Sequence, residues 1–178
     1  HQAAGPDPRD RSPAQMIQPP AVSLALDNQL CFKLYAASRA VTRAYKPMLD
    51  QLGLTYPQYV VMLVLWEWHD TPTSQPTVKA LGERLMLDSG TLTPLLKRLE
   101  QLALVRRRRS AQDEREVHLS LSDSGVQLRD QTLALKTRLL CASGVDLNQA
   151  DALRDGLDQL LVQIRALSSE APTGPAGH

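Results

Sequence analysis

The chain has 178 residues, a length that suits one domain or one protomer of an interlocked oligomer. Its 20 lysine and arginine residues nearly balance its 19 aspartate and glutamate residues, so the net charge of +1 does not by itself indicate a polyanionic partner. The two distant cysteines, Cys31 and Cys141, exclude a disulfide-rich scaffold and a zinc module, and His69 and His118 lack partners at ligand spacing, so we expect no metal and no cofactor.

The N-terminal segment, residues 1–23, is polar and rich in proline, and it lacks the apolar core of a signal peptide. No apolar run in the chain approaches the ~20 residues that a membrane-spanning helix needs. We therefore expect a cytoplasmic protein that does not enter a membrane, with disordered tails at residues 1–23 and 168–178.

Two long apolar patterns open the ordered part of the chain. From Leu26 to Pro47 the apolar residues recur at steps of three and four, which predicts an amphipathic helix that Pro47 and Gly53 interrupt. Thr55 and Gln58 then form a T-x-x-Q capping box, which predicts the start of a second helix. Its continuous apolar run indicates burial on most sides, and the proline-containing "HDTPTSQPT" predicts a loop after it.

The middle of the chain predicts two short helices followed by a β-hairpin. The helices span roughly Val78–Met86 and Ser89–Leu102, and only "LD" separates them. After them, "VRRRR" and "EVHLSLS" alternate in the manner of strands, with "SAQDER" as the tip between them. Two short helices followed by a hairpin are the pattern of a winged helix-turn-helix.

The C-terminal third returns to helical spacing. One helix is predicted from Ser122 or Asp123 to about Cys141, and a last helix from about Asn148 with an N-x-x-D cap onto Asp151. The last helix carries a near-heptad apolar stripe. Because the small middle cannot cover the long terminal helices, we expect two chains to intertwine them in a dimer. The stripe consists of Leu153, Leu157, Leu160, Ile164 and Leu167.

The predicted fold class is therefore mainly α with a small β-hairpin, a winged helix-turn-helix whose N- and C-terminal helices form an intertwined dimer. Between the tails we expect three regions: residues 24–56 as an N-terminal dimerisation helix, 57–121 as the winged helix-turn-helix, and 122–167 as C-terminal dimerisation helices.

The second helix of a helix-turn-helix places its N-terminal residues at base edges in the major groove. In this chain that end is rich in short hydrogen-bonding side chains, and the next turns carry cations, which predicts contacts with double-stranded DNA. An ordinary capped surface helix is the alternative. The candidate residues are Asp88, Ser89, Thr91, Thr93, Lys97 and Arg98.

The hairpin strengthens the prediction of DNA binding. Alternation along the strand prevents Arg107 and Arg109 from sharing one face with Arg106 and Arg108. An arginine at a protruding tip can enter the minor groove, and Arg115 lies at this tip with Asp113 close enough to orient it. A solvated hairpin with internal ion pairs remains the alternative.

Four segments of the chain resemble the MarR family of repressors, and within it the organic hydroperoxide regulators. They are "LDNQLCFKLYAASR", "YKPMLDQLGLTYPQY", "LDSGTLTPLLKRLEQ" and "RRRRSAQDEREVHLSLSDSG", and the likeness extends over about residues 26–165. The resemblance implies an obligate homodimer that binds a palindromic operator as a repressor, and it implies that Cys31 is the thiol that an organic hydroperoxide oxidises.

The resemblance also implies roles for two tyrosines and the second cysteine. A thiolate attacks peroxide, and hydroxyls of Tyr45 and Tyr56 from the other subunit would hydrogen-bond to it. One branch of the subfamily has a single sensor cysteine that reacts with a small thiol, and another has a C-terminal resolving cysteine. Cys141 suits the second branch, in which it would condense with the sulfenic acid of Cys31 to form an intersubunit disulfide. For each of these residues, ordinary packing in a core or interface is the alternative.

Three other functions stay open at this point. A MarR-type repressor could bind a phenolic ligand while both cysteines are structural, and a helical interaction protein could lack DNA binding. A thiol peroxidase is a third, although no arginine or hydroxyl residue closely precedes Cys31 and the chain has no C-x-x-C motif. We predict a DNA-binding regulator and not an enzyme.

Overall fold

The computed structural model describes residues 23–71 and 76–169. The expected tails, residues 1–23 and 168–178, and most of the "TPTSQP" loop therefore lie outside or at the margins of the described residues. The chain divides into two compact units, His1–Val41 and Thr42–His178. In the part that is described, no helix is both long enough and apolar enough to cross a bilayer.

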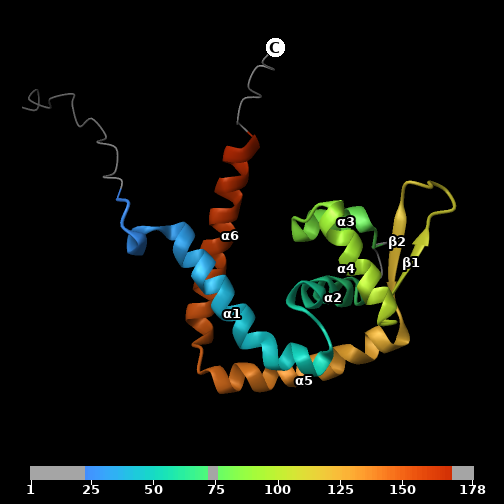
Figure 1. The fold of residues 1–178 in the computed structure, drawn as a ribbon, viewed down its shortest axis with the longest axis horizontal. Helices are drawn as coiled ribbons and strands as arrows, with labels where there is room; N and C mark the ends of the chain where they lie inside the picture. The colour runs from blue at the N-terminus through green and yellow to red at the C-terminus, as the bar shows by residue number, and fades with distance from the viewer. Residues whose placement is uncertain (1–22, 72–75, 170–178) are drawn as a thin grey trace, which may run out of the picture. The chain divides into compact units, whose positions relative to one another are not determined.

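The order of elements along the chain agrees with the predicted order of helices and hairpin (Figure 1). A single 3-10 turn precedes the first helix, and a two-stranded antiparallel hairpin separates the fourth helix from the fifth. The elements are η1 (Leu26–Asn28), α1 (Leu30–Leu52), α2 (Tyr56–His69), α3 (Val78–Leu85), α4 (Ser89–Gln101), β1 (Val105–Arg109), β2 (Val117–Leu121), α5 (Asp123–Ser143) and α6 (Leu147–Ser169).

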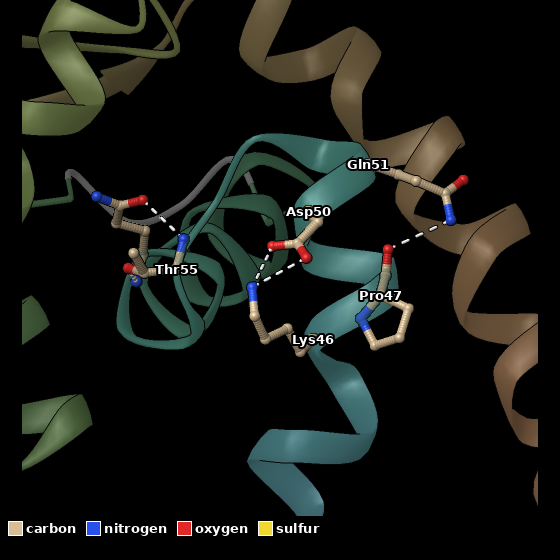
Figure 2. A network of polar contacts seen from close by, with 6 residues as sticks. Lys46, Pro47, Asp50, Gln51 and Thr55 are labelled. Atoms are coloured by element: carbon tan, nitrogen blue, oxygen red, sulfur yellow. Dashed lines mark hydrogen bonds and ion pairs between the residues drawn. The ribbon is translucent and has the colours of Figure 1, made fainter.

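The predicted end of the first helix at Pro47 is wrong, because α1 continues through Pro47 to Leu52. A proline in a helix interior removes one main-chain hydrogen bond. Local side chains support the next turn: Gln51 Nε2 donates to the Pro47 carbonyl at 3.3 Å, and Lys46 Nζ pairs with the Asp50 carboxylate at 2.7 and 2.9 Å (Figure 2). The helix continues because the turn after the proline is packed, with Met48, Leu49 and Leu52 all buried.

The junction between α1 and α2 follows the predicted turn and capping residues. Gly53 has φ +68°, a left-handed conformation that glycine adopts without strain, and it ends α1. The Thr55 hydroxyl accepts from the Gln58 N–H, and the Gln58 amide oxygen accepts from the Thr55 N–H at 2.9 Å. The predicted capping box is therefore confirmed.

The hydrophobic core of the second unit gathers around α2. The indole Nε1 of Trp66 donates to the Gly125 carbonyl at 2.8 Å, and Arg129 makes a two-pronged ion pair with Asp70 at the end of α2, which together hold α5 against α2. The largest fully buried side chains come from α2, α3 and α4: Tyr59, Val61, Met62, Leu81, Leu92, Leu96 and Leu99.

The winged helix-turn-helix has the predicted form. Met86, with φ 56°, ends α3 in a left-handed conformation, and Asp88 caps the N-terminus of α4, which starts at Ser89. In the hairpin, Val105 pairs with Leu121. The Leu119 N–H donates to the Pro76 carbonyl at 2.7 Å, so the segment before α3 lies alongside strand β2. Figure 1 shows the β1–β2 hairpin beside α3 and α4.

The start of the last helix differs from the prediction. Helix α6 begins at Leu147, and the Asp146 carboxylate accepts from the Asn148 N–H at 2.9 Å, so Asp146 occupies the capping position that we assigned to Asn148. Within this single chain much of the predicted apolar stripe is exposed to solvent: Leu153 is 64% exposed, Ile164 46% and Leu167 69%.

Candidate DNA-binding surface and cysteine sites

The N-terminus of α4 is held by its own polar side chains. The Asp88 carboxylate accepts from the Thr91 N–H at 2.8 Å and from the Thr91 hydroxyl at 3.2 Å. The hydrogen bond from the Thr91 N–H, followed by the one from its hydroxyl, lowers the pKa of Asp88. The Thr93 hydroxyl donates to the Ser89 carbonyl at 2.7 Å. Asp88 and Thr91 therefore fix the helix end, on which the Ser89 side chain is exposed.

A groove of about 720 Å³ lies between α3, the start of α4 and the hairpin. Three of the candidate residues line this groove together: Ser89 from α4, and Asp113 and Arg115 from the hairpin tip. Lys79 and Glu83 of α3 line its other side. The structure thus brings the helix end and the wing tip to one surface, as a DNA-reading unit requires.

The remaining two candidates lie further along α4. Lys97 and Arg98 are both exposed, and Arg98 Nη1 donates to the Gln101 side chain at 3.4 Å. Neither residue lines the groove, so they belong to the flank of the same helix.

The hairpin separates its arginines as the alternation predicts. Arg106 lies opposite Ser120 and Arg108 opposite His118, while Arg107 lies opposite the buried Leu119. The two faces of the wing therefore carry different residues, and one of them packs on the protein.

The tip residue Asp113 orients Arg115 through the main chain. Asp113 Oδ1 accepts from the Arg115 N–H at 2.9 Å, and the Asp113 carbonyl accepts from the Glu116 N–H at 3.0 Å. Asp113 therefore fixes the conformation of the loop through main-chain hydrogen bonds, and not through an ion pair with the Arg115 guanidinium. Arg115 is exposed.

Two arginines that we did not select lie on the outer face of the wing. A second groove, of about 880 Å³, is lined by Arg106 and Arg108 together with His118 and Ser124. Guanidinium groups at a groove edge suit phosphate oxygens. The alternation of the strand could have indicated that Arg106 and Arg108 share one face, but the sequence did not show which face would point outward.

Both cysteines are free and exposed in this chain. Cys31 is the second residue of α1, where the first-turn N–H groups have no intrahelical acceptors and favour an anion. Cys141 lies in the last turn of α5, three residues before Gly144 ends that helix. Neither thiol is a buried packing residue of the single chain. The described residues contain no cluster of metal-ligating side chains.

Tyr45 and Tyr56 lie in contact with a third tyrosine, Tyr59. The ring centroids of Tyr45 and Tyr56 are 5.9 Å apart in an edge-to-face arrangement, and Tyr59 lies 5.9 Å from the first and 6.1 Å from the second. Burial, and then the neighbouring Tyr56, raises the pKa of Tyr45. Burial and both neighbours raise the pKa of Tyr59 to about 12. The raised pKa values keep Tyr45 and Tyr59 protonated, and therefore able to donate hydrogen bonds, at neutral pH.

Comparison with known proteins identifies the family. The sequence model of the family described as "Transcriptional regulator SarA/Rot" matches residues 43–132, which span the whole winged helix-turn-helix. The organic hydroperoxide resistance transcriptional regulator of Bacillus subtilis is 51% identical over 129 residues, which are 71% of this chain and 84% of that protein. This chain belongs to the MarR-type family of winged-helix transcriptional regulators. The resemblance seen in the sequence is confirmed.

Solved structures agree with the assignment of this chain to the MarR-type family. Reduced AbfR bound to DNA, a protein of Staphylococcus epidermidis, matches with a TM-score of 0.67 and 36% identity over 78% of this chain and 94% of that one. Disulfide-formed AbfR matches with a TM-score of 0.55 and 35% identity over 82% and 93%. Because the family is one of transcriptional regulators and not of enzymes, we set the thiol peroxidase hypothesis aside.

Proposed function

We propose that this regulator is a homodimeric repressor that binds a palindromic operator in double-stranded DNA and releases it when an organic hydroperoxide oxidises Cys31. The observation that carries the proposal is the exposed Cys31 in the first turn of α1, in a chain 51% identical to an organic hydroperoxide resistance regulator. Repression of transcription requires contact with DNA, so the regulator acts in the cytoplasm.

The first chemical step takes place at the Cys31 sulfur. The thiolate attacks one peroxide oxygen, so that an S–O bond forms and the O–O bond breaks. The other oxygen leaves as an alkoxide, takes up a proton and becomes an alcohol. The N-terminal end of α1 supports this step because its N–H groups and dipole stabilise the negative sulfur. Hydroxyls of Tyr45 and Tyr56 from the other subunit add hydrogen bonds to it.

The second step uses Cys141 of the other subunit. Its sulfur attacks the sulfenic sulfur of Cys31, an S–S bond forms, the S–O bond breaks, and the oxygen leaves as water. The exposure of Cys141 in the single chain supports this role, as does the likeness to a regulator whose structure was solved with its disulfide formed. The likeness to an organic hydroperoxide regulator and to AbfR in its reduced and disulfide-formed states favours this role over structural cysteines with a phenolic inducer.

DNA binding and its loss follow from the symmetry of a dimer. Exposed apolar side chains along α6, such as Leu153 and Leu167, are the surface that a second chain would cover. The two α4 helices would then read half-sites about 34 Å apart, so a shift of a few ångströms on disulfide formation would prevent both from binding at once.

Serine variants of the two cysteines test the proposal. Operator binding by the full-length dimer is measured in a gel shift before and after an organic hydroperoxide, and again after dithiothreitol, with mass spectrometry of the thiols. Cys31→Ser should stay on the operator after peroxide. Cys141→Ser should oxidise beyond the sulfenic acid and should not regain binding after reduction. A Cys31→Ser dimer that leaves DNA as readily as the wild type would refute a sensing role for this thiol.

A Cys141→Ser dimer that recovers fully after reduction would contradict the two-cysteine mechanism and leave a one-cysteine sensor. The wild type should show a Cys31–Cys141 bond between subunits on a nonreducing gel. Arg154→Ala, a charge change on α6 where Arg154 pairs with Asp151, serves as the control that should respond to peroxide like the wild type.

A further inference from the structure

Tyr59 of α2 is a buried tyrosine to which the proposed function gives no role. Its side chain is 2% exposed, and its hydroxyl is the one buried side-chain nitrogen or oxygen atom without a hydrogen-bond partner in the described part of the chain. A buried hydroxyl without a partner costs free energy, and folded proteins seldom keep one. An unpaired hydroxyl at a fixed position suggests a second state of the protein in which it is paired.

The neighbours of Tyr59 are the two tyrosines assigned to the thiol. Its ring is tilted by 48° against Tyr45 and by 54° against Tyr56, with the centroids 5.9 and 6.1 Å apart. Tyr45 and Tyr56 are half-buried, whereas Tyr59 is almost fully buried. Aromatic rings at this separation are in direct contact, so the three tyrosines form one cluster. All three residues lie in the second unit of the chain.

We propose that Tyr59 is a positioning residue of the redox site, whose hydroxyl accepts a hydrogen bond from Tyr45 or Tyr56 after Cys31 has been oxidised. The inference rests on the proposed function. While Cys31 of the other subunit is a thiolate, it is the acceptor for both phenols. Once its sulfur is part of a disulfide, that anionic acceptor is gone, and a half-buried phenol that has lost it gains from another oxygen. The Tyr59 hydroxyl, in contact with both phenols through its ring, is an unpaired acceptor in the same subunit.

This arrangement affects the two redox states in opposite ways. In the reduced state the Tyr59 hydroxyl is buried and unpaired, which disfavours that state. In the oxidised state the same hydroxyl gains a partner and relieves the phenol. The Tyr59 hydroxyl therefore shifts the equilibrium between free thiols and disulfide toward the disulfide. A phenylalanine ring at this position would not cause this shift.

Tyr59→Phe separates the oxygen from the ring, because the ring contacts remain and only the hydroxyl is lost. The oxidised full-length dimer is equilibrated with buffers of reduced and oxidised dithiothreitol, and the fraction of Cys31–Cys141 bond is measured on nonreducing gels. The equilibrium should shift toward the free thiols by about 3- to 10-fold, the equivalent of one buried hydrogen bond between neutral groups. The melting temperature of the reduced variant should be unchanged or higher.

Met62→Leu is the matched control, because Met62 lies on the same helix, is 0% exposed and keeps its volume on substitution. It should leave the redox equilibrium at the wild-type value. An unchanged equilibrium in Tyr59→Phe, or a lower melting temperature of its reduced form, would overturn the inference while the wild-type redox cycle stands. If the wild type forms no Cys31–Cys141 bond, the two-cysteine proposal fails first, and this inference fails with it.

Discussion

The carboxylate of Glu100, near the end of α4, holds Arg107 of the wing by its main chain and its side chain. Oε1 accepts from the Arg107 N–H at 3.2 Å, and Oε2 accepts from Arg107 Nε at 2.6 Å. This double contact joins the wing to the helix that would read DNA. Strand pairing places Arg107 opposite the buried Leu119, so Arg106 and Arg108 lie on the other face of the hairpin.

The Glu100–Arg107 contact predicts a stability difference that depends on pH. The Arg107 guanidinium lowers the pKa of Glu100 below its ordinary value of 4.5. The contact therefore stabilises the fold above about pH 4.5, and this stabilisation is lost as the pH falls through the lower pKa of the folded state. Glu100→Gln should reduce the free energy of unfolding by roughly 0.5–1 kcal/mol at pH 7.

Urea unfolding of Glu100→Gln and the wild type at a series of pH values measures this difference. It should shrink toward zero in acid. Glu83→Gln, at an exposed position of α3, makes the same chemical change outside the Glu100–Arg107 contact and serves as the control. A difference that stays constant from pH 7 down to pH 3 would show that the charge of Glu100 is not its source.

Arg115 at the wing tip should contribute to operator affinity. If its guanidinium enters the minor groove, Arg115→Ala should cost about 1–3 kcal/mol of binding and lower the salt slope by about one unit. Asp113→Ala should weaken binding less, because Asp113 acts through the Arg115 main chain. Fluorescence anisotropy over a salt titration measures both quantities, with Arg154→Ala on α6 as the control. An Arg115→Ala dimer with the affinity and salt slope of the wild type would exclude the wing tip from DNA contact.

The phenols of Tyr45 and Tyr56 should affect the rate of oxidation and not the affinity for DNA. Each phenylalanine substitution removes one hydroxyl and keeps the ring contacts of the cluster. Loss of a hydrogen bond to a charged sulfur should slow the oxidation of Cys31 by about tenfold or more. Stopped-flow oxidation with an organic hydroperoxide, together with a gel shift of the reduced dimer, measures the two effects. Wild-type oxidation rates in both variants would remove the tyrosines from the thiol site.

The close packing of α5 against the wing predicts a severe effect at Gly125. A Cβ at this position would lie 2.2 Å from the Leu104 carbonyl oxygen. The Gly125 carbonyl also accepts a hydrogen bond from the Trp66 indole N–H, so a shift of the Gly125 backbone would disturb that bond. Gly125→Ala should therefore cost roughly 1–3 kcal/mol of unfolding free energy, and more if the backbone cannot shift. Thermal unfolding measures it.

Gly156→Ala on α6 is the control for Gly125→Ala, because nothing lies within 4 Å of a Cβ at Gly156. In a helix interior this change should leave stability unchanged or raise it by about 0.5–1 kcal/mol. Equal destabilisation of the two variants would mean that the contact with Leu104 is not the cause.

Local patterns in the sequence determined the elements and the fold class. The capping box of Thr55 and Gln58, the helical spacing before and after the hairpin, and the alternation in "EVHLSLS" each depend on neighbours within a few residues, so they could be interpreted without tertiary contacts. The candidate residues at the start of α4 and at the wing tip followed from those elements. The structure then places Ser89 and Arg115 on one groove.

Contacts between distant residues decided the rest. Helix α1 passes Pro47 because Leu52 and its neighbours are buried, and no local rule weighs that burial against a lost hydrogen bond. Glu100 of α4 pairs with Arg107 of the wing, and Tyr59 of α2 packs against Tyr45 of α1. These outcomes depend on which side chains meet in three dimensions, and only the tertiary structure contains that information.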